Sequence, residues 1–159
     1  MKSVDHLQTM ALTYQEIEQG EQPWVALGNF MNDWFDYARD RRIELVATPL
    51  SMPEHPSEEM HRWEVFCAAS VEYLCGRAAL PCPSWVNDPQ YARLAEPWFD
   101  APMAHKPSVR AFLLEQTPEP FARRNIYCGN RVFANKYELA EQYHRLPAPI
   151  TIPPSSFLA

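Results

Sequence analysis

The fold of this chain is decided by the stretch SEEMHRWEVFCAASVEYLCGRAALP, which covers residues 57–81. Along it, apolar and small residues recur every three or four positions, as they do on the buried face of an amphipathic helix. These residues are Met60, Trp63, Phe66, Cys67, Ser70, Val71, Leu74 and Cys75. Ser57 is suited to cap the first turn, where Glu58 and Glu59 complement the helix dipole. The pattern therefore predicts a central core helix that ends before Pro81.

Two more long helices are expected on the N-terminal side. The chain holds sixteen prolines and four glycines, so we expect proline rather than glycine to end its helices. The first helix is expected over residues 4–19. The second begins at Pro23, and its apolar stripe consists of Trp24, Leu27, Met31, Trp34, Phe35 and Ala38. This helix can continue through Val46 until Pro49 ends it, and residues 48–56 are typical of a loop.

The C-terminal half is expected to hold shorter helices between proline-rich turns. Residues 81–107 favour turns, with one short helix near residues 89–94. Ser108 is suited to cap a following helix, and a further short helix should begin after Thr117. Strand signals are nearly absent, because no hairpin dipeptide and no sustained polar–apolar alternation occurs.

The last predicted helix starts at a capping box. Asn135 is followed three residues later by Glu138, a spacing that predicts a helix from this point to about His144. Residues 147–159 hold four prolines and are expected to form an extended tail. The sequence thus predicts a mainly α fold, with one helical domain over residues 1–146 and about three longer and several short helices.

Composition and charge limit the classes of function. Apolar residues make up 47% of the chain, which excludes disorder for most of its length. The formal charge of −6 works against binding to nucleic acid or to an anionic membrane. No signal-peptide pattern and no apolar run long enough to span a bilayer occurs. The four cysteines form no Cys-x-x-Cys pair, and together these features predict a cytoplasmic protein.

Residues 117–133 concentrate positive charge among aromatic residues. The candidate binding residues here and just beyond are Arg123, Arg124, Tyr127, Arg131 and Lys136. They can form a recognition surface for an anionic partner, with the Tyr127 ring as a stacking face for a base. Alternatively, the guanidinium groups pair with carboxylates on the helices and bond loop carbonyls. The acidic composition favours this second, structural interpretation.

Two Glu-x-x-His pairs raise the possibility of a metal site. Glu58 with His61, and Glu141 with His144, have the spacing that places two ligands on one helical face in di-iron bundles. Glu58 falls in the first turn of its predicted helix, whereas such ligands project into the middle of a bundle. We therefore interpret these pairs as surface residues and expect no cofactor. Cys128, near two arginines, is a candidate nucleophile that would still need a base.

Ordered aromatic, proline and arginine residues extend through about half of the chain, from Trp63 to Phe133. They are Pro83-Ser-Trp85, Asp88-Pro89, Pro97-Trp98-Phe99, Arg110-Ala111 and Thr117-Pro-x-x-Phe-x-Arg-Arg-Asn-Ile-Tyr127. This arrangement resembles an uncharacterised bacterial domain associated with helix-turn-helix regulators and toxin–antitoxin-like gene neighbourhoods. The resemblance implies an intracellular bacterial protein with a regulatory role, and no established activity comes with it.

The expected function is that of a non-catalytic protein-interaction or regulatory module in a toxin–antitoxin-like setting. This expectation rests on the missing catalytic constellation, the aromatic richness and the apolar tail. The partner is expected to be another protein or a second copy of the chain, with no membrane. Two alternatives remain open. They are nucleic-acid or nucleotide binding through Arg123, Arg124 and Arg131, and a metal-dependent enzyme that uses both Glu-x-x-His pairs.

Overall fold

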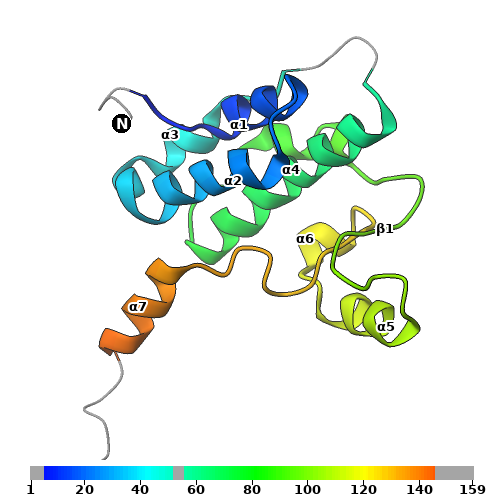
Figure 1. Ribbon diagram of the computed structural model, residues 1–159. Coiled ribbons are helices and arrows are strands. Elements are labelled where there is room, and N and C mark those ends of the chain that lie inside the picture. The colour runs from blue at the N-terminus through cyan, green and yellow to red at the C-terminus, as the bar shows by residue number, and fades with distance from the viewer. Residues whose placement is uncertain (1–5, 52–55, 146–159) are drawn as a thin grey trace, which may run out of the picture.

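The computed structural model describes residues 6–51 and 56–145 of the chain (Figure 1). These residues form seven α-helices, joined by short 3-10 and π-helical segments, and one two-stranded sheet. The mainly α fold predicted from the sequence is confirmed. The tail predicted over residues 147–159 lies outside the described residues.

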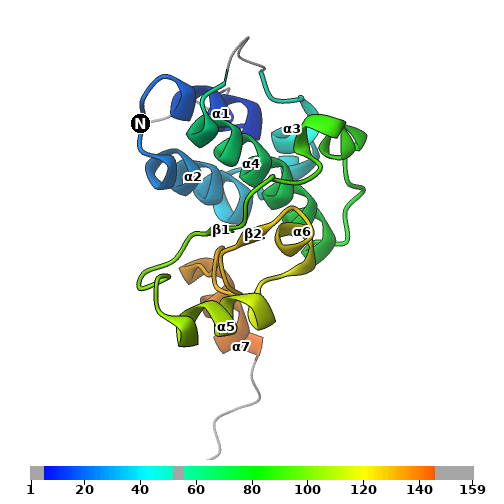
Figure 2. The same ribbon diagram turned by 90° about the vertical axis from the view of Figure 1, so that its right-hand side faces the viewer.

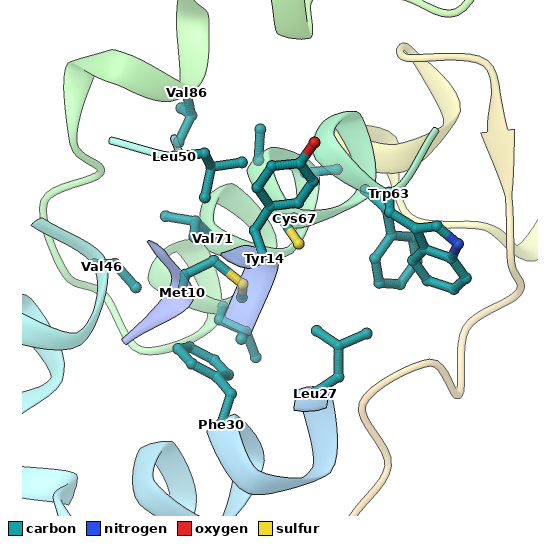
Figure 3. Close-up of a cluster of buried hydrophobic side chains, with 14 of the residues drawn as sticks. Met10, Tyr14, Leu27, Phe30, Val46, Leu50, Trp63, Cys67, Val71 and Val86 are labelled. Carbon is teal, nitrogen blue, oxygen red and sulfur yellow. The ribbon is translucent and has the colours of Figure 1, made fainter. Parts of the chain in front are cut away.

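Helix α4 (Glu58–Arg77) lies at the centre of the fold, as predicted. The Ser57 hydroxyl caps it by accepting a hydrogen bond of 3.1 Å from the backbone N–H of Met60. All nine residues from Trp63 to Val71 are buried, so the middle of the helix is enclosed on every side rather than along one stripe. Figure 3 shows side chains from α4 facing those of α1 and α2 in this core.

Helices α1 (Met10–Glu18) and α2 (Pro23–Asn32) pack against each other, and α1 also packs against α4 (Figures 1 and 2). The start predicted for the first helix, at residue 4, is wrong. The hydroxyl of Thr9 accepts a 3.0 Å hydrogen bond from the N–H of Leu12, so Thr9 is the cap and the helix begins at Met10. Pro23 occupies the first turn of α2 as predicted.

The predicted continuation of the second helix through Val46 is also wrong. Helix α2 passes into a π-helical turn, η1 (Asp33–Tyr37), then a 3-10 turn, η2 (Arg39–Arg41), and finally helix α3 (Arg42–Ala47). The N–H of Ala38 donates to the carbonyl of Asp33, five residues earlier, at 2.8 Å. This separation of five residues is that of a π turn. The Trp34 carbonyl instead accepts a 2.8 Å bond from Nε of Arg42. The interruption thus brings an arginine back against the end of α2.

The C-terminal half carries short elements around α4. They are the 3-10 turns η3 (Ser84–Asn87) and η4 (Pro89–Tyr91), strands β1 (Trp98–Phe99) and β2 (Ile126–Tyr127), and helices α5 (Pro107–Gln116), α6 (Glu119–Ala122) and α7 (Lys136–Arg145). The two strands pair in parallel, a contact that the sequence did not predict. The short helix expected near residues 89–94 is only a 3-10 turn.

Two predicted helix caps have different outcomes. Ser108 is not a cap, because Pro107 already occupies the first turn of α5 and Lys106 precedes it. Asn135 caps α7 as predicted: its Oδ1 accepts from the N–H of Glu138 at 2.8 Å, and its Nδ2 donates to the Glu138 carboxylate at 3.1 Å. Figure 1 shows α5 and α7 extending from the helical body on different sides.

Candidate functional site

Arg124 is buried, with 1% of its surface exposed. It follows α6, and its guanidinium donates to the carbonyls of Tyr91 at 2.9 Å, Pro120 at 2.7 Å and Val86 at 3.0 Å. The nitrogen that bonds Val86 also lies 3.4 Å from the Glu72 carboxylate. Burial lowers the pKa of Arg124, and the negative charge of Glu72 opposes that shift. These contacts tie η3, η4 and α6 to α4, which is the role that the structural interpretation assigns to the arginines.

Arg123 lies beside Arg124 but reaches solvent. Its guanidinium pairs with Glu72 and lies 3.7 Å from Glu119. The carboxylate of Glu72 therefore serves both arginines. Both guanidinium groups contact carboxylates of the chain itself, and this local neutralisation reduces the attraction that the pair offers to an external anion.

The other candidate residues of this cluster have separate neighbours. The Tyr127 ring stacks on Phe99 with centroids 5.0 Å apart. The ammonium group of Lys136 lies 5.2 Å from the centre of the Tyr137 ring, and Arg131 is exposed in the turn before α7. Their described contacts are thus to different parts of the fold.

The two Glu-x-x-His pairs differ in how far they can be described. Glu58 pairs with Arg62 at 3.1 Å, and Nδ1 of His61 lies 4.0 Å from the Glu64 carboxylate. Glu141 and His144 belong to α7, but their side chains lie outside the described part of the chain. Among the side chains that are described, no group of three or more His, Cys, Asp or Glu residues is placed to hold a metal ion.

The candidate nucleophile Cys128 is half-buried rather than exposed. Burial, together with the negative charge of Asp100, raises the pKa of its thiol to about 12. The thiolate is the reactive form of cysteine, so Cys128 is a protonated and weakly nucleophilic thiol near neutral pH. Cys67 and Cys75 are buried free thiols, as the sequence predicted.

Within the described residues, four pockets lie in a row in which each shares lining residues with the next, and we call this row the groove. The first pocket, beside α7, shares Arg77 and Glu138 with the second. The second shares Arg39 and Arg42 with the third, and the third shares Ile43 with the fourth. The groove therefore runs from α7, past the end of α4, to α3 and the segment before η3. In Figure 1 these elements lie at the side of the molecule from which α7 extends.

The groove combines positive charge with exposed apolar side chains. Four arginines line it, Arg39, Arg41, Arg42 and Arg77, together with three carboxylates, Asp40, Glu44 and Glu138. Arg41 pairs with Glu44 at 2.7 Å, and this contact lowers the pKa of that carboxyl. Ile43 is 58% exposed and Leu139 is 63% exposed, at separate pockets of the row. Such a surface can hold a ligand that carries both acidic and apolar groups.

The groove was missed by the sequence interpretation, which expected one continuous helix from Pro23 through Val46. A local signal was present, because three of the four residues from Arg39 to Arg42 are arginines in an acidic chain. What the sequence lacks is any indication that this run meets the end of α4 and the start of α7. That meeting depends on the break in the helix at Ala38.

The chain is thus a mainly α protein with an arginine-lined groove. No described helix has the length and apolarity needed to cross a membrane. Comparisons with protein-family models, curated proteins and solved structures found no match.

Proposed function

We propose that this chain is a protein-interaction module that holds a segment of another protein in the groove. The observation that carries the proposal is the pairing of exposed apolar residues with arginines along one continuous row of pockets. Ile43 and Leu139 each expose more than half of their surface there. Covering such residues with a partner removes apolar area from water and stabilises the complex.

Charge selects the chemistry of the partner. The whole chain has a formal charge of −6, yet in the groove the four arginines outnumber the carboxylates Asp40, Glu44 and Glu138. A segment with acidic side chains next to apolar ones matches this local charge, and its binding is favoured both by charge complementarity and by burial of apolar surface. A nucleic acid fits less well, because it would bring many phosphates near the acidic remainder of the surface. Arg124, from the cluster first considered for nucleic acid, is engaged by the fold.

We further propose that the interaction is regulatory, in a toxin–antitoxin-like setting, and takes place in a reducing compartment such as the bacterial cytoplasm. All four cysteines are free, and two of them are buried in the core as thiols. Free buried thiols are typical of proteins from reducing compartments. The resemblance of the aromatic and arginine pattern to a bacterial regulatory domain supports the regulatory setting.

Co-purification with groove variants tests the proposal. Tagged wild-type chain and the variants Ile43→Asp and Leu139→Asp are recovered from source cells, and bound proteins are quantified by mass spectrometry. Phe112→Asp on α5 is the matched control, since Phe112 is 54% exposed and lies outside the groove. We expect one partner to be lost from both groove variants and retained by the control. Equal recovery of every bound protein by all three variants would reject the groove, and so would recovery of the tagged wild-type chain with no bound protein.

A further inference from the structure

The second pocket of the groove, counted from α7, is lined by three arginines that come from three different elements. Arg39 belongs to η2, Arg42 begins α3, and Arg77 ends α4. All three line a single hollow of about 250 Å³. Trp34 and Tyr137 supply aromatic surface in the same hollow. A volume of this size is smaller than that of most drug-sized ligand sites and suits one compact group.

Two of these guanidinium groups are held in place by contacts of their own. Arg42 lies over the Trp34 ring, 4.9 Å from its centroid, while its Nε donates to the Trp34 carbonyl. Arg77 lies 5.6 Å from the centroid of the Tyr73 ring. A side chain that is already ordered loses little conformational entropy when a ligand binds. The pocket is therefore prepared for an anion before one arrives.

Glu138 is the carboxylate that faces these arginines in the pocket. It pairs with Arg77 and is anchored by Asn135 at the start of α7. The pair with Glu138 shows that Arg77 is placed to bind a planar anion, here a carboxylate. It also competes with any external anion, both by occupying Arg77 and by adding negative charge to the pocket.

We propose that this pocket binds an anionic group, a carboxylate or a phosphate, carried on an apolar body. Arginine matches the geometry of both anions through its planar fork of donors, and Trp34 and Tyr137 offer contact surface for the body. The inference rests on the proposed function, because the pocket is the central part of the same groove. The anion can belong to a free small molecule or to an acidic side chain of the bound segment, and the chemistry of recognition is shared.

Titrations with phenyl phosphate and with inorganic phosphate test the site. Binding to the whole chain is monitored by NMR through the indole and arginine N–H signals. Arg77→Gln removes one guanidinium group from the pocket. We expect about tenfold weaker binding of phenyl phosphate, as for loss of a hydrogen bond to a charged group. Arg62→Gln is a closely matched control. Arg62 lies on the same helix, pairs with Glu58 and lies over the Trp98 ring, and its side-chain exposure of 37% is close to the 41% of Arg77. This control should leave the affinity unchanged.

Glu138→Gln separates anion binding from loss of structure. Both Arg77→Gln and Glu138→Gln break the pair between α4 and α7, so simple loosening would weaken binding in both variants. If the pocket binds anions, Glu138→Gln instead tightens binding several-fold, since it frees Arg77 and removes a negative charge. The Gln carbonyl can still accept the hydrogen bond from Asn135. Weaker binding in both variants would overturn the inference.

A library of random twelve-residue peptides displayed on phage distinguishes the two sources of the anion. Phenyl phosphate binding that depends on Arg77, with no selected peptide that depends on it, indicates a free ligand. Selected peptides that are enriched in Asp or Glu, and that bind Arg62→Gln but not Arg77→Gln, indicate a partner's side chain. If neither probe depends on Arg77, the anion site is rejected. Dependence of the peptides on Ile43 and Leu139 would in that case still support the groove.

Discussion

Replacement of Arg124 by Ala should destabilise the protein by about 3–5 kcal/mol. The substitution leaves the carbonyls of Tyr91, Pro120 and Val86 without their donor, and it removes a positive charge next to Glu72. A buried polar group without a partner costs about 1–3 kcal/mol, and breaking a buried charge pair costs about 3–5 kcal/mol. Water can satisfy part of this loss at the half-buried Pro120 carbonyl, so the terms do not add in full.

Arg123→Ala is the internal control for this prediction. Arg123 is 40% exposed on its side chain and forms ion pairs near the surface, where such pairs contribute about 0–1 kcal/mol. Urea unfolding of the two variants, followed by far-UV circular dichroism, gives both free energies, and an unchanged m value confirms a comparable transition. Arg124→Lys should recover only a small part of the loss, because an ammonium group cannot reach three separated carbonyls as the planar fork does. A cost below about 1 kcal/mol for Arg124→Ala, or equal costs for the two alanine variants, would refute the structural role of Arg124.

Two further predictions concern α4. Burial, and then the negative charge of Glu18, raises the pKa of Glu64 in the folded protein, so wild-type stability should fall as the pH rises above about 4.3, the unfolded value. The side chain in Glu64→Gln does not ionise, so the unfolding free energy of this variant should increase relative to that of the wild type as the pH rises over this range. A difference that does not change with pH would contradict the raised pKa. Ser57→Ala removes the cap on Met60 and should lower the unfolding free energy by about 1 kcal/mol, whereas Ser57→Asn, another good cap, should restore it; equal losses in both variants would show that the cap does not stabilise α4.

The features that the sequence predicted correctly depend on residues close together in the chain. Ser57 and Asn135 bond N–H groups three residues away, and Pro23 fits a first helical turn whatever surrounds it. The apolar repeat of residues 60–75 likewise needs only the period of a helix. Each signal is complete within a few residues, so tertiary contacts did not need to be known.

The features that were missed depend on contacts between distant residues. Asp33, where the π turn begins, accepts a buried hydrogen bond from the N–H of Gln8, 25 residues earlier. The strands β1 and β2 pair Trp98 with Ile126, and two residues per strand are too few for an alternating pattern. The neighbours Arg123 and Arg124 have the same chemistry, and only the turn after α6 makes one exposed and the other buried.

The groove joins three separate parts of the chain, and this explains why the sequence did not predict it. Arg39 and Arg42 precede α4, Arg77 ends it, and Glu138 lies in α7. The sequence placed the candidate cluster of arginines and aromatics at residues 117–133, where Arg124 bonds three carbonyls of the fold.

Photo-crosslinking tests the central claim, that the groove is where another protein binds. The photoreactive residue p-benzoylphenylalanine is placed at Ile43, at Leu139 and, as a control outside the groove, at Phe112. The cells are irradiated and the adducts are identified by mass spectrometry. We predict that Ile43 and Leu139 crosslink to the same partner protein, through a segment with acidic and apolar residues, and that Phe112 does not. Adducts to that partner from Phe112 alone, or none from either groove position, would contradict the claim.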